Sequence, residues 1–273
     1  MAVGRIHERE FVLNQESNIV LAAVQGHVCT ITINRPEARN ALHDGVITGI
    51  GQALAQAAAD PQVRAVVLTG AGNKAFCAGA DLKPGSGIFD FDYSQPTTAY
   101  ANLLRQVMAY TLPLVARVNG ACMAGGMGLL TMCDLAVAAD HCRFGLPEVK
   151  IGLFPLQVAA VMQNMVQRRK FAELCITGEP ITAHEALEMG LVNYVVKAED
   201  LDTKMAWLLA RIVDKSPTAI RRGKYALRAI EDMTFAQSIA HMETEIATLR
   251  LTADAQEGLT AFVEKRAPSW TGR

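Results

Sequence analysis

Two glycine-rich segments hold the residues with the clearest potential for chemistry. One is GACMAGGMGLLTMCD at 120–134, and the other is FCAGADL at 76–82. Small side chains leave backbone N–H groups uncovered in both, and the first segment leads into an apolar run of helical character. A helix N-terminus carries free N–H groups and a partial positive charge. We therefore predict that each segment offers one N–H to a shared substrate oxygen, as in an oxyanion hole.

The same glycines have a second interpretation. Residues without a side chain also allow a strand and a helix to pack closely together. The residue types alone support the oxyanion hole and the packing interpretation equally.

Glu148 is the candidate acid or base. It lies in the apolar segment GLPEVKIGL, and it is the only carboxylate between Asp140 and Glu173. A carboxylate in an apolar wall is suited to proton transfer, because burial raises its pKa toward the working pH. The alternative is a surface glutamate in a loop, and without the glycine segments that interpretation would be preferred.

Other common site motifs have little support. GAGNKA at 70–75 follows a predicted strand, but a turn comes next, whereas a dinucleotide-binding motif requires a helix there. No Gly-x-Ser-x-Gly motif is present, and the six histidines are scattered without metal-ligand spacing. The six cysteines form no Cys-x-x-Cys pair and have apolar neighbours, so we expect buried free thiols and no metal site.

Composition favours one large domain, or a domain with an appendage. The chain has 273 residues, of which 51% are hydrophobic and 19% charged, with a formal net charge of −1. The absence of a basic tract argues against nucleic-acid binding. The longest nearly uncharged run, 118–133, is too short to span a membrane. Free thiols and a charged N-terminal segment lead us to expect a cytoplasmic protein.

Hydrophobic periodicity predicts an α/β core followed by a helical region. We place the core, with its parallel strands, at 1–200 and a helical oligomerisation region at 201–273. A loop that extends to about residue 97 is either a lid or a solvated excursion. The predicted elements are a hairpin at 19–33, strands at 64–69, 114–118, 134–139 and 192–196, and helices at 43–59, 98–110, 156–164, 168–175, 182–189 and 254–264, with three more helical stripes after 200.

Taken together, these segments resemble the crotonase superfamily, the enoyl-CoA hydratase/isomerase family. The resemblance covers nearly the whole chain. It implies a spiral of repeated β-β-α units with a C-terminal helical region that forms trimers, or hexamers built from two trimers. The segments that carry it are NRPEARNAL, KAFCAGADL, VNGACMAGG, CDLAVAA, FGLPEVKIGL, ITAHEALEMGLVNYVV and EGLTAFVEKRAP.

The resemblance also implies roles for individual residues. The oxyanion hole would consist of the backbone N–H groups of Ala78 and Gly125, which hold a thioester carbonyl, and Glu148 would transfer the proton. Coenzyme A would be part of the substrate, with no separate cofactor. Its contacts, with those of the acyl chain, would come from Arg39, Ala41, Asp81, Leu82, Gly126, Gly128, Phe262 and Lys265.

Gly128 departs from the pattern of the family's hydratases. Those enzymes use two glutamates: one matches Glu148, and the other falls at Gly128, which has no acidic residue within five positions. The label enoyl-CoA hydratase follows from the family, whereas a single glutamate favours an isomerase that moves a proton between carbons. Gly128 would also free volume for a branched acyl chain or a second water. Thioester hydrolysis, decarboxylation, dehalogenation and a non-catalytic or RNA-binding protein remain as alternatives.

Overall fold

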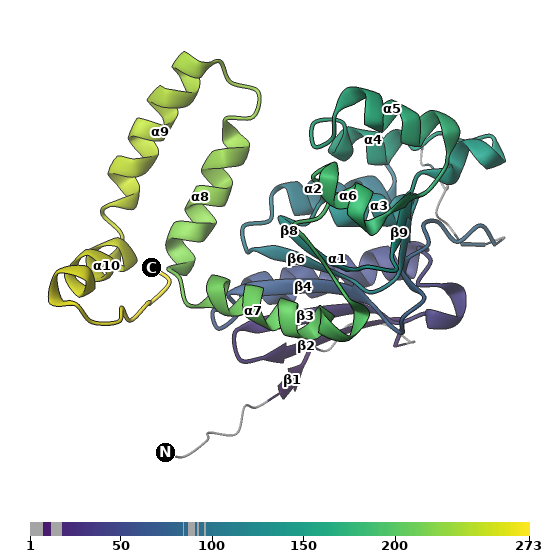
Figure 1. Cartoon of the computed structure of the whole chain (residues 1–273). Coiled ribbons are helices and arrows are strands. Elements are labelled where there is room, and N and C mark those ends of the chain that lie inside the picture. Colours follow the sequence, from purple (N-terminus) through teal and green to yellow (C-terminus); the bar gives the residue numbers. More distant parts are fainter. Residues whose placement is uncertain (1–7, 12–17, 84, 87–90, 92, 96) are drawn as a thin grey trace.

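A seven-stranded sheet forms one layer of the protein. The structure is a computed structural model that describes residues 8–11, 18–83, 85–86, 91, 93–95 and 97–273. Strands β1, β2 and β3 pair antiparallel, and β3, β4, β6, β8 and β11 are parallel (Figure 1). In spatial order the strands are β1 (Glu8–Glu10), β2 (Val20–Gln25), β3 (Val28–Ile33), β4 (Ala65–Gly70), β6 (Leu114–Val118), β8 (Leu135–Ala139) and β11 (Tyr194–Val196).

A second sheet has four very short strands. Strands β5, β7 and β9 run parallel, and β10 pairs antiparallel with β9. The sequence did not predict these strands, because two or three residues are too few for a periodic pattern. In the two glycine-rich segments, the glycines at 79 and at 125–128 come directly after β5 and β7. In spatial order the strands are β10 (Ile181–Thr182), β9 (Arg143–Gly145), β7 (Ala121–Met123) and β5 (Ala75–Cys77).

The chain alternates between the two sheets. Three consecutive units each place one strand in the large sheet and the next strand in the small sheet, and then continue into a helix. This is the predicted repeat of β-β-α units. The units are β4–β5–α2 (Ala99–Met108), β6–β7–α3 (Gly125–Thr131) and β8–β9, which continues into the 3-10 helix η2 (Pro147–Ile151) and α4 (Leu156–Met162).

The hydrophobic core lies between the sheets and the helices around them. Helix α1 (Asp44–Ala59) confirms the helix predicted at 43–59, and its apolar face is buried. The hairpin and the predicted strands of the large sheet are confirmed as well. All six cysteines are free and buried, as expected. Helices α5 (Arg168–Thr177) and α6 (Ala183–Glu188) complete the part of the core before β11.

The C-terminal helices differ in how they meet this core. Helix α7 (Leu201–Val213) packs Leu201, Met205 and Leu208 into the core cluster. Helices α8 (Pro217–Ala229), α9 (Phe235–Leu249) and α10 (Ala253–Glu264) form a lobe that stands beside the core in Figure 1. The domain boundary at residue 200 stays a prediction.

The loop that extends to residue 97 lies partly outside the described residues. No helix in the described part of the chain is long and apolar enough to span a membrane.

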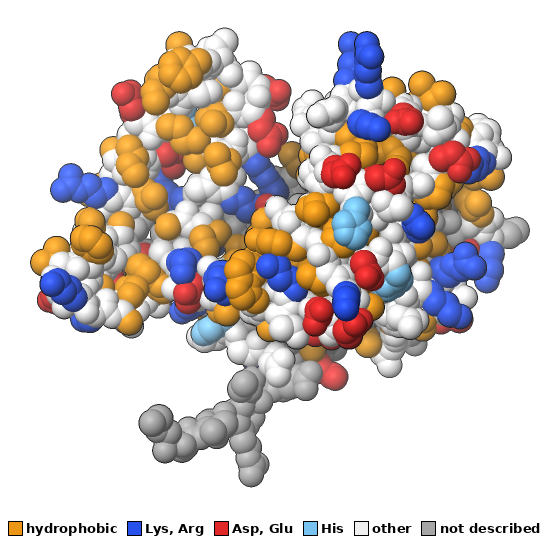
Figure 2. All heavy atoms as spheres, in the orientation of Figure 1, with side chains coloured by type: hydrophobic (Ala, Val, Ile, Leu, Met, Phe, Trp, Pro, Cys, Tyr) orange, Lys and Arg blue, Asp and Glu red, His pale blue; other side chains and the backbone are white. Residues whose placement is uncertain are grey.

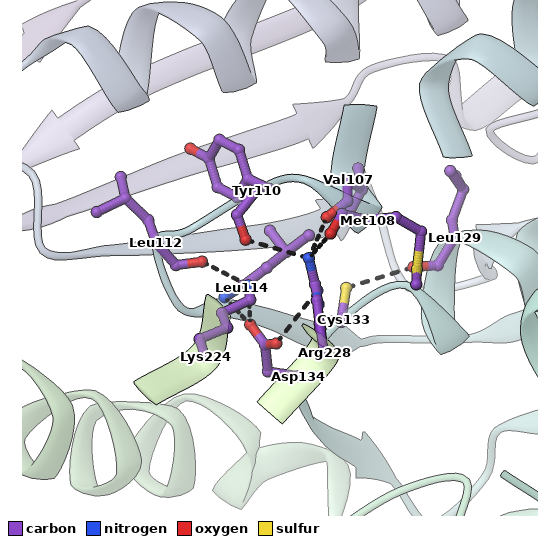
Figure 3. Close-up of polar contacts among 10 residues, drawn as sticks. All are labelled: Val107, Met108, Tyr110, Leu112, Leu114, Leu129, Cys133, Asp134, Lys224 and Arg228. Atoms are coloured by element: carbon purple, nitrogen blue, oxygen red, sulfur yellow. Dashed lines mark hydrogen bonds and ion pairs between the residues drawn. The ribbon is translucent and has the colours of Figure 1, made fainter. Parts of the chain in front are cut away.

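Two cations from α8 attach the lobe to the core (Figure 3). Lys224 donates to Asp134 at 2.6 Å and to the Leu112 carbonyl at 2.7 Å. Arg228 donates to the Val107 carbonyl at 2.7 Å and lies 3.7 Å from Asp134. Asp134 also accepts the Leu114 N–H at 2.7 Å. Burial lowers the pKa of Lys224, and the neighbouring Asp134 carboxylate opposes this shift.

Replacing Asp134 should therefore weaken the attachment of the lobe. In Asp134→Ala two largely buried cations lose their carboxylate, which costs about 3 kcal/mol of unfolding free energy in comparable pairs. The matched control is Asp202→Ala, because Asp202 pairs with Arg117 but is 80% exposed, so its loss should cost under about 1 kcal/mol. Urea denaturation measures both values, and equal small losses would contradict this role of Asp134.

Candidate functional site: an N–H pair beside a buried glutamate

Three segments meet at one edge of the small sheet. Strands β5, β7 and β9 are parallel neighbours, so their carboxyl ends lie together. The residues that follow these ends are the segments at 78–82, at 124–128 and at 146–148. The structure thus brings together the two glycine-rich segments and Glu148, which the sequence separates widely.

Gly125 supplies the first free N–H group. It is the first residue of α3, where the helix geometry leaves the N–H without an acceptor. This N–H has no hydrogen-bond partner in the part of the chain that the structure describes, and the residue is partly exposed. The prediction that Gly125 presents an N–H group at a helix start agrees with this geometry.

Ala78 does not have the free N–H group that the sequence predicts for it. The N–H of Ala78 donates to the Arg39 carbonyl at 3.1 Å and is therefore occupied. Ala80 forms a parallel bridge with Leu42, in which Gly79 and Asp81 make the hydrogen bonds. The N–H of Ala80 consequently points away from Leu42, and it has no partner among the described residues. Ala80, not Ala78, has the free N–H in this segment.

Gly79 places these two N–H groups next to each other. It has a φ of +93°, and a Cβ added to it would lie 3.3 Å from the Gly125 nitrogen and 2.6 Å from the Ala124 Cβ. Only a residue without a side chain permits this approach. Gly126 has the packing role, because a Cβ there would lie 2.4 Å from the Cys77 carbonyl oxygen. Both interpretations of the glycines therefore hold, at different positions.

Glu148 is partly buried in η2. Its Oε2 atom is buried and makes no hydrogen bond within the described part of the chain. Burial raises the pKa of this carboxyl above the usual range of a glutamate, and the residue's own backbone N–H opposes the shift. A carboxylate that has one unpaired buried oxygen and a raised pKa is a typical proton acceptor.

Gly128 does not leave an empty space. A Cβ at this position would lie 2.1 Å from the Tyr100 hydroxyl oxygen and 3.4 Å from Val158. The expectation of free volume for a branched chain or a second water is therefore wrong at this point. The Tyr100 hydroxyl occupies the space and donates to the Gly125 carbonyl at 2.6 Å. Tyr100 cannot be recognised from the sequence as a residue of the site, because its helical spacing is that of an ordinary core residue of α2.

The segment proposed to contact coenzyme A lies beside the site. Residues 39–42 run alongside 78–81, through the bonds of Ala78 to Arg39 and of Asp81 to Leu42. Arg39 and Leu82 are exposed, whereas Ala41 is buried. The Asp81 carboxylate accepts from Arg35 at 2.9 Å, and this hydrogen bond lowers its pKa. The structure thus assigns the Asp81 side chain to Arg35, and binding of coenzyme A by this segment stays a prediction.

The two tail residues do not join the site within one chain. Phe262 is 84% exposed on α10, and Lys265 ends that helix with a φ of +54°. Figure 1 shows α10 on the opposite side of the molecule from α3. Their predicted contact with substrate would therefore require a neighbouring subunit. As for metals, the residues that the structure describes contain no group of His, Cys, Asp or Glu that could hold an ion.

Comparison with known proteins identifies relatives of the whole chain. The family described as enoyl-CoA hydratase/isomerase matches residues 19–273. The (E)-benzylidenesuccinyl-CoA hydratase of Thauera aromatica is 32% identical over 260 residues, which cover 93% of this chain and 99% of that protein. The crystal structure of an enoyl-CoA hydratase from Bacillus anthracis has a TM-score of 0.86 at 30% identity, covering 94% and 100% of the two chains. The crystal structure of an enoyl-CoA hydratase from Mycobacterium tuberculosis has a TM-score of 0.84 at 31% identity, again covering 94% of this chain and 100% of that chain.

The backbone that precedes Gly125 is strained, which leads to a stability prediction. Ala124 has a φ of +50° and a ψ of −121°, a conformation that suits glycine and costs other residues about 1–3 kcal/mol. Ala124→Gly should therefore raise the unfolding free energy by about 1 kcal/mol. The matched control, Ala58→Gly on the exposed face of α1, should lower it by about 1 kcal/mol. Chemical denaturation that gave a loss for both variants would contradict the strain at Ala124.

Proposed function

Because the chain belongs to the enoyl-CoA hydratase/isomerase family, we propose that it is an acyl-CoA enzyme in which a single glutamate transfers the proton. The reaction that the site supports best is the shift of a double bond from a 3-enoyl-CoA to a 2-enoyl-CoA. One observation carries this choice: the position of the second acid is Gly128, and the Tyr100 hydroxyl fills the space beside it.

The N–H groups of Ala80 and Gly125 would hold the thioester oxygen. Removal of a proton from the carbon next to a thioester places negative charge on that oxygen. Two fixed N–H dipoles stabilise the charge, and one such donor contributes roughly 3 kcal/mol to the transition state in known enzymes. The start of α3 adds a partial positive charge at the same place.

Glu148 would act first as base and then as acid. Its carboxylate takes a proton from C2 of the 3-enoyl-CoA, and the C–H electron pair moves into an enolate whose charge lies on the thioester oxygen. The resulting carboxylic acid then gives the same proton to C4. The enolate electrons form the new C2–C3 double bond, the C3–C4 double bond becomes a single bond, and the thioester is unchanged. No other reactant is consumed.

Hydration is the second candidate, and the names of the relatives favour it. Addition of water to a 2-enoyl-CoA requires one group that activates the water and one group that delivers a proton to C2. Asp81 is bound to Arg35, and among the described residues of the three segments Glu148 is the remaining carboxylate, so one group would have to perform both tasks. This is why the site supports isomerisation better than hydration.

We also propose that the C-terminal lobe joins subunits into trimers or hexamers. Figure 2 shows hydrophobic side chains spread over the lobe, and their exposure would be unfavourable in a lone chain. A trimer would also bring Phe262 and Lys265 near the substrate of a neighbouring subunit. Light scattering that gave the mass of one chain would contradict this proposal. The exposed side chains on the lobe include Tyr225, Leu227, Phe235, Ile239, Ile246, Leu259, Phe262 and Val263.

The reaction type is tested with two substrates offered separately. With a 3-enoyl-CoA we expect the absorbance of a conjugated thioester to increase, because the product is a 2-enoyl-CoA. With a 2-enoyl-CoA we expect little change, since the isomerisation does not consume water. Rapid loss of that absorbance with formation of a 3-hydroxyacyl-CoA would instead establish hydration.

The role of Glu148 predicts both a mutant effect and a pH effect. Glu148→Gln should lower kcat by roughly 10³-fold, because it removes the proton acceptor, without loss of thermal stability. In the wild type, log kcat/KM should fall as the pH falls through the raised pKa of Glu148, because protonation removes the base. The acidic limb should thus lie above the usual glutamate range.

The control is Glu199→Gln, an exposed glutamate that lies outside the site. It should leave the rate and the pH profile unchanged. Activity of Glu148→Gln near that of the wild type would show that another group transfers the proton.

A further inference from the structure

Tyr100 makes an unusual connection between α2 and the start of α3. Its side chain is buried, with 5% of the residue exposed, and its hydroxyl donates to the Gly125 carbonyl at 2.6 Å. A carbonyl oxygen has two lone pairs, so this bond is compatible with the helical bond to the same oxygen. Among the described residues, this is the only side-chain hydrogen bond to the segment 124–126.

Apart from the Met127 N–H, which donates to the Ala124 carbonyl at 2.8 Å, the start of α3 has little other support among the described residues. The helix has seven residues, and Ala124, which precedes it, offers no side-chain cap. The backbone at Ala124 is strained, with a φ of +50°. The Ala124 N–H bonds to the Gly145 carbonyl at 2.9 Å, which fixes the preceding peptide to β9. The Tyr100 hydrogen bond fixes the peptide group between residues 125 and 126. The Gly125 N–H therefore lies between two anchored peptide groups.

The hydrogen bond of the Tyr100 hydroxyl requires a glycine at position 128. Glycine inside a helix is destabilising relative to alanine, so its presence in a seven-residue helix is unfavourable by itself. A Cβ at this position would lie 2.1 Å from the hydroxyl oxygen and 3.2 Å from the Cζ atom of Tyr100. An alanine or a glutamate there would displace the hydroxyl. Gly128 and Tyr100 therefore form one structural unit.

We propose that Tyr100 is a positioning residue of the oxyanion hole: its hydroxyl takes the place of a side chain at position 128 and, through the Gly125 carbonyl, holds the Gly125 N–H in its direction. Burial and the nearby Glu148 charge raise the pKa of the phenol, so the hydroxyl stays protonated and remains a donor. This inference deepens the proposed function and rests on it for the identity of the bound carbonyl.

The first test removes only the hydroxyl. Tyr100→Phe should lower kcat for the 3-enoyl-CoA by about 10-fold and leave KM within about 2-fold, because the Gly125 N–H loses its alignment with the charged oxygen. A dimethylaminocinnamoyl thioester of coenzyme A serves as the probe. Its absorption moves to longer wavelength when its carbonyl is polarised, and this shift should shrink in the variant.

Tyr110→Phe is the matched control. Tyr110 is also buried, with 6% exposed, and its hydroxyl also donates to a helix carbonyl, that of Leu54 at 3.0 Å. Tyr110→Phe should lose about as much thermal stability as Tyr100→Phe. It should change neither the absorption shift of the probe nor kcat. Equal effects of both variants on shift and kcat would overturn the positioning role. A wild type that shifts the probe but converts neither enoyl-CoA would refute the proposed reaction and leave this comparison valid.

The second test needs no substrate. Gly128→Ala should lower the unfolding temperature of the wild type by about 5 °C through the clash with the hydroxyl, and by less than half as much in Tyr100→Phe. Equal losses in the two backgrounds would show that position 128 and the hydroxyl are not coupled, and would overturn the proposal even if no substrate were found.

Discussion

The parallel pairing of β5, β7 and β9 is the constraint on which the site depends. Each of these strands has only three residues, yet the pairing places the three segments that follow them at one edge of the small sheet. A free N–H comes from the first segment, a helix start from the second and Glu148 from the third. The large sheet supports this arrangement, because each β-β-α unit first adds a strand there and only then a strand to the small sheet.

The strand pairing can place two free N–H groups side by side only because the backbones of the neighbouring segments approach each other closely. Gly126 lets α3 pack on the carbonyl of Cys77, and Gly79 lets the first segment reach Gly125. These contacts come with strain at Ala124, which the surrounding hydrogen bonds hold in place. A rigid pair of N–H groups is valuable because it needs no rearrangement when charge develops on a bound oxygen. The structure thus combines a stable core with a strained local backbone at the site.

The sequence predicted those features that depend on local pattern or on chemical character. Periodicity identified the β2–β3 hairpin, α1 and the buried strands of the large sheet. The apolar surroundings of Glu148 identified it as the candidate base, and in the structure it follows β9, at the edge of the small sheet where the two glycine-rich segments also lie. Resemblance to the family supplied the repeated β-β-α architecture, which the comparisons confirm.

The sequence could not predict features that depend on register or on contacts between distant segments. The choice of Ala80 over Ala78 follows from the hydrogen bonds of Ala78 to Arg39 and of Asp81 to Leu42, and from the φ of +93° at Gly79, which interrupts the regular alternation of N–H directions. The filled space at Gly128 follows from a tyrosine on another helix. The separation of Phe262 from the site reflects the position of the whole lobe. None of these leaves a periodic signal in the chain.

A crystal structure of the protein with a bound, non-reactive acyl-CoA would show which N–H groups hold the thioester oxygen. We expect that oxygen to lie about 3 Å from the backbone nitrogens of both Ala80 and Gly125. We also expect the Glu148 carboxylate to face the carbon atoms next to that carbonyl. A thioester oxygen bound elsewhere, or held by the Ala78 N–H after loss of its bond to Arg39, would refute the proposed oxyanion hole.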